Sequence, residues 1–149
     1  MKKSGLFAAF LALLGLQLQS CEYGCPYTTF KTNGTVQDEN GDNIKGAKVS
    51  VKIDIITEDH DPAGSRPDTI KCNKQTVTTD RKGYYETTHK DIDDVNFKTV
   101  NYEVITNKDG YEPDTIREEV NKSGIRFKDG DTWETIASHK INIVLKKNK

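Results

Sequence analysis

Sustained helical periodicity is what this 149-residue sequence most clearly lacks. No segment repeats apolar residues with the 3.6-residue spacing of an amphipathic helix. The segment Asp114 to Val120 offers one helical turn at most, and Pro113 together with β-branched neighbours disfavours even that. These absences predict a fold that depends on strands.

Motifs for metal binding and catalysis are also missing. His60, His89 and His139 lie far apart, and neither His-Glu-x-x-His nor Cys-x-x-Cys occurs, which disfavours a zinc site. No nucleophile elbow, glycine-rich phosphate loop or dinucleotide fingerprint is present. Asp38, Asn40 and Asp42 have the first spacings of a calcium loop but lack its glycine and its final glutamate. We therefore expect no enzyme, no bound metal and no cofactor.

An excess of charge of one sign is absent as well. The chain has 22 basic and 23 acidic residues, and residues 1–20 contain two of the basic ones and none of the acidic. Residues 21–149 thus carry 20 basic and 23 acidic residues, a net charge of −3. This mixed surface predicts no binding to nucleic acid.

Long hydrophobic runs are confined to the N-terminus, where Lys2 and Lys3 precede an apolar stretch from Leu6 to Leu16. Eleven helical residues reach only about 16 Å, short of the ~30 Å hydrocarbon layer. The layout is typical of a secretory signal rather than a membrane span. It divides the chain into a removable signal over 1–20, a tether over 21–29 and a folded domain over 30–149.

The end of this signal, Leu18-Gln19-Ser20-Cys21, resembles the lipobox of bacterial lipoproteins. That resemblance implies a diacylglyceryl group on the Cys21 thiol and cleavage on its N-terminal side. An ordinary secreted protein in which Cys21 is an incidental thiol is the alternative. The lipid would attach the protein to a membrane of the cell envelope, which we expect to be the outer membrane, on a face that the sequence leaves open.

Lipidation of Cys21 leaves Cys25 and Cys72, an even pair in an oxidising compartment. A bridge between them would close a loop of about 48 residues and stabilise the fold by ~4 kcal/mol in the chain-entropy model. The alternative is two isolated thiols, because Cys25 lies in the expected tether.

Short runs rich in Val, Ile, Thr and Tyr fill the rest of the chain, separated by Gly, Asn and Asp. Apolar and polar residues alternate without interruption from Ala47 to Ile55, which predicts a half-buried strand. Other strands are expected over Gln75–Thr79, Tyr84–Thr88, Phe97–Thr106 and His139–Leu145. Turns are expected at Asn40-Gly41, Arg81-Lys82-Gly83 and Asp109-Gly110, and long surface loops over Thr57–Pro67 and Val120–Asp131. This pattern predicts an all-β sandwich of two antiparallel sheets.

Two stretches carry a family resemblance. The text from Gly34 to Val49 and the later Thr79-Asp80-Arg81-Lys82-Gly83-Tyr84-Tyr85 are similar, in the same order, to the opening and second turn of carboxypeptidase-regulatory-like domains. Asn43 stands where that family commonly has proline. The resemblance implies a transthyretin-like, immunoglobulin-like antiparallel sandwich of about seven strands over roughly residues 30–146.

A narrower resemblance joins the start Cys21-Glu22-Tyr23-Gly24-Cys25-Pro26 to this domain and to the ending Ile141–Lys146. It is similar to small Gram-negative lipoproteins described as radical-SAM-associated, a group without an established activity. This resemblance implies that a radical-SAM enzyme could be a partner, or could modify Cys25, Cys72 or a tyrosine.

Three further residues are candidate sites. Asp-Thr-Ile occurs twice and resembles an O-glycosylation acceptor of exported proteins, which would place sugar on Thr69 and Thr115; two ordinary polar loop segments are the alternative. Trp133 lies in a polar stretch, where it either packs over the end of the sandwich or contacts a ligand. We expect a lipid-anchored, non-catalytic module that binds an envelope protein or glycan through loops at one end of the sandwich, chiefly Thr57–Pro67 and Val120–Trp133.

Overall fold

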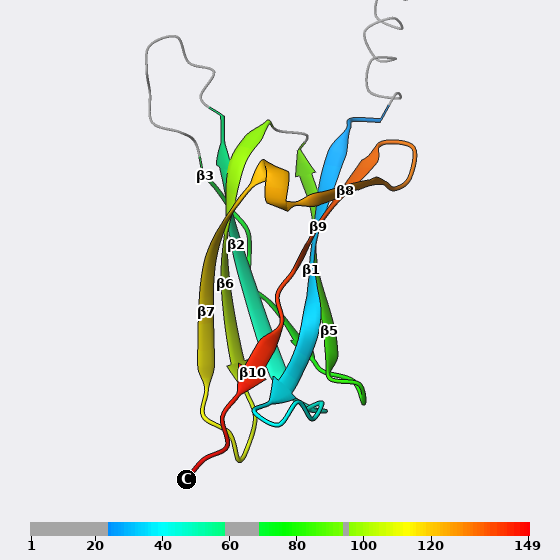
Figure 1. Ribbon diagram of the computed structural model, residues 1–149. Helices are drawn as coiled ribbons and strands as arrows, with labels where there is room; N and C mark the ends of the chain where they lie inside the picture. The colour runs from blue at the N-terminus through cyan, green and yellow to red at the C-terminus, as the bar shows by residue number, and fades with distance from the viewer. Residues whose placement is uncertain (1–23, 59–68, 94–95) are drawn as a thin grey trace, which may run out of the picture.

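A computed structural model describes residues 24–58, 69–93 and 96–149. Within them the chain forms two β-sheets packed face to face, so the predicted all-β sandwich is confirmed (Figure 1). The described part contains ten strands rather than about seven, and one 3-10 turn, η2, over Lys122–Gly124. The strands are β1 Tyr27–Asp38, β2 Lys48–Thr57, β3 Thr69–Lys71, β4 Gln75–Thr78, β5 Tyr84–Asp93, β6 Phe97–Asn107, β7 Asp114–Asn121, β8 Arg126–Asp129, β9 Glu134–Lys140 and β10 Ile143–Leu145.

The first sheet is built around β1. Strand β5 pairs antiparallel with one edge of β1, while β9 and then β10 pair parallel with the other edge, and β8 extends the sheet beyond β9. The expectation of purely antiparallel pairing is therefore wrong for β9 and β10. Tyr27 is opposite Glu134 and Val36 is opposite Ile143, so β9 and β10 keep one register along β1. The expected strand over His139–Leu145 is therefore present but interrupted at Ile141 and Asn142.

The interruption has a local cause in the glycine opposite it. A Cβ atom on Gly34 would lie 1.9 Å from the carbonyl oxygen of Ile141, so only glycine permits this approach. The side-chain Oδ1 of Asn142 accepts from the amide of Thr35 at 3.2 Å, in place of a backbone acceptor. Tyr85 donates its hydroxyl to the Ile141 carbonyl at 2.7 Å. These bonds satisfy the backbone where the strand ladder breaks.

The second sheet is built around β2 and β6, which pair antiparallel, with β7 beyond β6. Strands β3 and β4 pair with successive parts of the other edge of β2. The uninterrupted alternation from Ala47 to Ile55 is explained by β2, whose apolar face is fully buried. The segment Asp114–Val120 is strand β7, because its pairing with β6 supplies the hydrogen bonds that a helical turn would have made internally.

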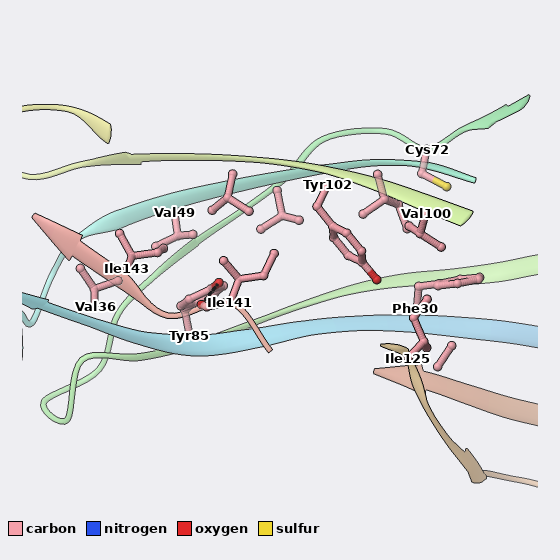
Figure 2. Packing of buried hydrophobic residues seen from close by; sticks show 14 of the residues in the cluster. Phe30, Val36, Val49, Cys72, Tyr85, Val100, Tyr102, Ile125, Ile141 and Ile143 are labelled. Carbon is pink, nitrogen blue, oxygen red and sulfur yellow. Dashed lines mark hydrogen bonds between the residues drawn. The ribbon is translucent and has the colours of Figure 1, made fainter. Parts of the chain in front are cut away.

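The core lies between the sheets. Figure 2 shows Val36, Phe30 and Tyr85 from the first sheet facing Val49, Val100 and Tyr102 from the second. Tyr85 is 2% exposed and Tyr84 41%, as expected for neighbours on opposite faces of a strand. No helix among the described residues is long and apolar enough to cross a membrane.

The glycines of the predicted turns have the backbone conformation that favours glycine. Gly41, Gly83 and Gly110 all have positive φ angles. At Gly83 space is also limiting, because a Cβ atom would lie 2.5 Å from the carbonyl oxygen of Val36. The predicted turns at these three positions are confirmed.

Candidate functional site

The chain enters the fold at the end of the sandwich that carries the turn between β8 and β9 (Figure 1). Strand β1 begins at Tyr27, so the expectation that the fold starts near Phe30 is wrong. Thr28 and Thr29 are polar but buried, because β5 and β9 pair with β1 on both sides there. Fewer residues than the sequence indicated therefore separate Cys21 from the first described contact with the fold.

Trp133 makes that first contact. Its carbonyl oxygen accepts from the amide of Tyr27 at 2.9 Å. Its ring lies against Gly24, where a Cβ atom would be only 2.5 Å from Cδ1 and Nε1 of the indole. Trp133 thus packs over the end of the sandwich, one of the two expected arrangements, while 46% of the residue stays exposed.

Glu134 fixes the turn that carries Trp133. Its amide donates to the Asp131 carbonyl at 2.9 Å, and its own carbonyl accepts from Gly130 at 3.0 Å. The carboxylate accepts from Thr29 Oγ1 at 2.5 Å, a bond that lowers the pKa of Glu134, with a further contribution from the Asp131 amide. The turn is consequently attached to β1 by side-chain and backbone bonds.

A row of aromatic rings runs from the core to the same end. Phe30 meets Phe97 edge to face at 5.5 Å between centroids, and Phe97 lies 6.1 Å from Phe127. The Nζ of Lys122 lies 5.4 Å from the Phe97 centroid, within cation–π range. Phe127 is 46% exposed. We call Phe127, Trp133 and the β8–β9 turn between them the hairpin end.

One of the two predicted binding loops is not a loop. Residues 120–131 contain the end of β7, the η2 turn and all of β8, so that expectation is wrong. The β8 residues are all exposed and lack alternation, and they form a strand because they pair with β9. Of the other predicted loop, residues 59–67 lie outside the described residues. Phe127 was missed, although an isolated phenylalanine in a polar stretch was a usable signal.

A concave surface lies where β9 meets β1, β8 and the η2 turn. His139 Nε2 is 3.0 Å from Glu118 Oε2, and the His139 ring is 5.0 Å from the ring of Tyr102. Beside this pair is a depression of about 280 Å³, which we call the lateral groove, lined by Asn33, Gly124, Arg126, Ser138, His139 and Lys140. Sequence reasoning missed it because neither the pairing of β8 with β9 nor the position of Asn33 beside Lys140 is visible in the local pattern.

The two cysteines of the described part are free. Cys25 is exposed and Cys72 is buried, so the bridge considered from sequence is not formed in this structure. Burial raises the pKa of the Cys72 thiol, and the nearby Asp54 carboxylate raises it further. Cys72 and His89 line a depression of about 260 Å³, but a protonated thiol is a poor nucleophile. Cys21 lies outside the described residues.

The candidate glycosylation residues both lie at strand beginnings rather than in loops. Thr69 is the first residue of β3 and half-buried. Thr115 is the second residue of β7 and is exposed. Among the described strands, β7 pairs only with β6, so its other edge is unpaired there. Sugar attachment at either stays a prediction.

The acidic set near Asp38 has a local role. The Asp38 carboxylate accepts from the amides of Asn40 and Asp42 at 2.9 and 3.0 Å, and these bonds lower its pKa. It therefore holds the turn before β2. Across the residues that the structure describes, no group of three or more His, Cys, Asp or Glu side chains could hold a metal ion.

Comparison with known proteins gives a likeness of fold only. No family model and no curated protein matches the chain. Catechol 1,2-dioxygenase from Pseudomonas arvilla C-1 aligns with a TM-score of 0.54 and 13% identity over 85% of this chain and 55% of its own. Chlorocatechol 1,2-dioxygenase from Pseudomonas putida aligns with a TM-score of 0.50 and 14% identity over 81% of this chain and 61% of its own.

These identities are too low to transfer an activity or a site. The chain also spans only about half to three-fifths of the length of these enzymes. What the comparison shows is that the sandwich resembles the β-domain of intradiol ring-cleavage dioxygenases such as catechol 1,2-dioxygenase.

Proposed function

We propose that this chain is a lipid-anchored, non-catalytic binding or accessory module of a bacterial cell envelope, attached through Cys21. The anchor rests on the lipobox-like Leu18-Gln19-Ser20-Cys21, and the structural observation that extends it is the position of Gly24, which already contacts the folded domain at Trp133. Only residues 22 and 23 separate it from Cys21 in the sequence. A lipid on Cys21 would keep the sandwich against the bilayer, so a partner has to be met close to the membrane.

A carboxypeptidase-regulatory-like assignment accompanies this proposal. The turns that the resemblance places at Gly41 and Gly83 have the positive φ angles that make glycine favourable there. Gly46 has one too, directly before the buried Ala47. These features support the transthyretin-like assignment, in which the motif residues serve folding rather than chemistry.

The anchor is tested on the mature protein purified from bacterial membranes. We expect an N-terminus at Cys21 with a mass increase equal to two or three acyl chains, and incorporation of labelled palmitate. Cys21→Ser should abolish both, while Cys25→Ser, four residues away, should leave both unchanged. Cleavage elsewhere or an unmodified Cys21 would refute the anchor. Protease treatment of whole cells then shows whether the proposed outer-membrane location is on the surface face.

For the partner, the lateral groove is the surface that we propose. Arg126 and Lys140 are exposed beside His139, and the groove also offers the amide of Asn33 and the hydroxyl of Ser138. Donors and acceptors of this kind suit a polar glycan or an acidic protein segment.

Binding is tested with the unlipidated fragment 22–149 as bait against envelope extract. The double variant Arg126→Glu/Lys140→Glu should lose the captured partner. Lys45→Glu/Lys82→Glu makes the same charge change in exposed turns at the other end of the sandwich and should retain it. Equal capture by both variants would contradict the groove as the binding surface.

A second candidate function follows from exposure of the modifiable residues. Cys25 and Tyr84 are accessible, whereas Cys72, Tyr85 and Tyr102 are buried. If the chain is the substrate of a radical-SAM partner, modification of the folded protein should fall on Cys25 or Tyr84. Intact-mass analysis would show a change explained by neither lipid nor sugar and absent from Cys25→Ser or Tyr84→Phe.

A further inference from the structure

The hairpin end is the part of the described surface where large aromatic side chains are exposed beside the chain's path to its lipid. Four large hydrophobic residues of the described chain are exposed: Tyr84, Phe127, Trp133 and Val144. Two of them, Phe127 and Trp133, flank the same β8–β9 turn. The ring of Trp133 packs against Gly24, and the ring of Phe127 lies 6.1 Å from that of Phe97. Their exposed faces are therefore held in place.

We propose that the hairpin end inserts into the headgroup layer of the bilayer that carries the Cys21 lipid, with Trp133 and Phe127 as the inserted side chains. This inference rests on the proposed lipid anchor. Three residue steps separate Cys21 from Gly24 and span at most about 11 Å when extended. The polar layer on each side of a bilayer is itself roughly 5–8 Å thick. A tryptophan that touches Gly24 is consequently within reach of that layer.

The chemistry of the hairpin end fits this occupant. Tryptophan combines an apolar ring with one N–H donor and is enriched at the membrane interface for that reason. Arg126 and Lys128 are offset by Asp129 and Asp131 in the same hairpin, so its charge is balanced. The contact should therefore depend on aromatic insertion and should change little between neutral and anionic lipids.

Anchoring makes a weak contact sufficient. Two aromatic side chains would bind a vesicle poorly from solution, but a lipid on Cys21 holds them at a high local concentration of lipid. The insertion would also orient the molecule. The end of the sandwich with the β1–β2, β4–β5 and β6–β7 turns lies opposite the hairpin end and would then point away from the bilayer (Figure 1).

Because Trp133 is the only tryptophan, its fluorescence reports on this contact alone. The acylated mature protein is reconstituted in vesicles of phosphatidylcholine and phosphatidylethanolamine that contain phosphatidylcholine brominated near the headgroup end of the acyl chains. We expect at least twofold quenching and a blue-shifted emission relative to unbrominated vesicles and to the unlipidated fragment. Replacing a fifth of the lipid with phosphatidylglycerol should leave the quenching unchanged.

The matched control moves the tryptophan to the opposite end of the fold. Trp133→Phe/Tyr84→Trp places the indole beside the Gly83 turn, where we expect no quenching in the same vesicles. Phe127→Ser in the otherwise native chain should reduce the quenching of Trp133, with circular dichroism confirming the fold. Flotation of the vesicles measures anchoring separately. Protein that floats with unquenched Trp133, or equal quenching at the two positions, overturns the insertion alone. Protein that fails to float overturns the anchor and the insertion together.

Discussion

The amide of Tyr27 donates to the carbonyl of Trp133 at 2.9 Å and thereby joins the first residue of β1 to the turn between β8 and β9. More than a hundred residues separate the two along the chain. The bond, together with the Thr29–Glu134 side-chain contact, makes the start of the fold and the hairpin end one structural unit. Changes on one side of this unit should thus be detectable on the other.

Gly24→Ala is the direct test of that coupling. The new Cβ would lie 2.5 Å from two atoms of the Trp133 ring, and Gly24 has a φ of +39°, so the ring has to move. We expect red-shifted Trp133 emission and stronger acrylamide quenching in the unlipidated fragment, with a loss of unfolding free energy below ~2 kcal/mol. Gly110→Ala adds a Cβ that has no atom outside the adjoining residues within 4 Å, so it should leave the emission unchanged. Identical spectra for the two variants would contradict the contact.

Elements with strong local patterns were predictable from sequence, and those made by pairing between distant strands were not. The alternation in Ala47–Ile55 and the glycine turns are local signals, and both are present as expected. Tyr27–Thr29 resemble a tether in sequence, yet they are strand because β5 and β9 flank them. Likewise β8 has no alternation of its own and is a strand only through β9.

The candidate functional residues can be separated in the same way, into features that the sequence could identify and contacts that it could not. Trp133 could be selected from sequence because an indole in a polar stretch needs packing or a ligand. Its contact with Gly24 could not be predicted, because it depends on the parallel placement of β9 beside β1. The contact of His139 with Glu118 could not be predicted either, because it joins β9 of one sheet to β7 of the other. Composition alone carries no information on such a register.

Gly34→Ala should destabilise the fold more than Gly41→Ala. The added methyl would lie 1.9 Å from the Ile141 carbonyl oxygen, which belongs to the backbone and is held by Tyr85. Overpacking of this kind costs about 1–3 kcal/mol or more. Urea unfolding of the 22–149 fragment measures it, with Gly41→Ala as the reference for a glycine that has open space around it. Equal midpoints for the two variants would contradict the close approach.

The two Asp-Thr-Ile sequences predict O-linked sugar on protein isolated from its native envelope. Thr115 is exposed on β7, and Thr69 is half-buried at the beginning of β3, so modification of the folded chain should favour Thr115. We expect a mass increase that falls with Thr115→Ala and disappears in Thr69→Ala/Thr115→Ala. Thr78→Ala, another exposed strand threonine, is the control. An unmodified intact mass for the native protein would refute the prediction.

Acidification should destabilise the domain through His89. Burial lowers the pKa of this side chain, and the bond from its Nε2–H to the Asn73 carbonyl at 3.0 Å offsets only part of the effect. A histidine whose pKa is lower in the folded state contributes stability above its unfolded pKa of about 6.5, and loses it as the pH falls below that value.

The slope from this one group is at most ~1.4 kcal/mol per pH unit. Urea midpoints between pH 7.5 and 5 should therefore fall for the native fragment and fall less for His89→Gln. The lower limit of pH 5 keeps Glu134 and Asp38 ionised, because their pKa values are lowered. Parallel curves for the two proteins would show that His89 does not sense pH.

The two buried tyrosines should respond in opposite ways to loss of their hydroxyl groups. Tyr85 donates to the Ile141 carbonyl at 2.7 Å, whereas the Tyr102 hydroxyl has no hydrogen-bond partner within the described residues (Figure 2). Tyr85→Phe leaves a buried carbonyl unpaired and should cost about 1–3 kcal/mol. Tyr102→Phe removes an unpaired polar group and should be neutral or stabilising by up to ~1 kcal/mol. Urea unfolding distinguishes them, and a larger loss for Tyr102→Phe than for Tyr85→Phe would contradict the unpaired state of the Tyr102 hydroxyl.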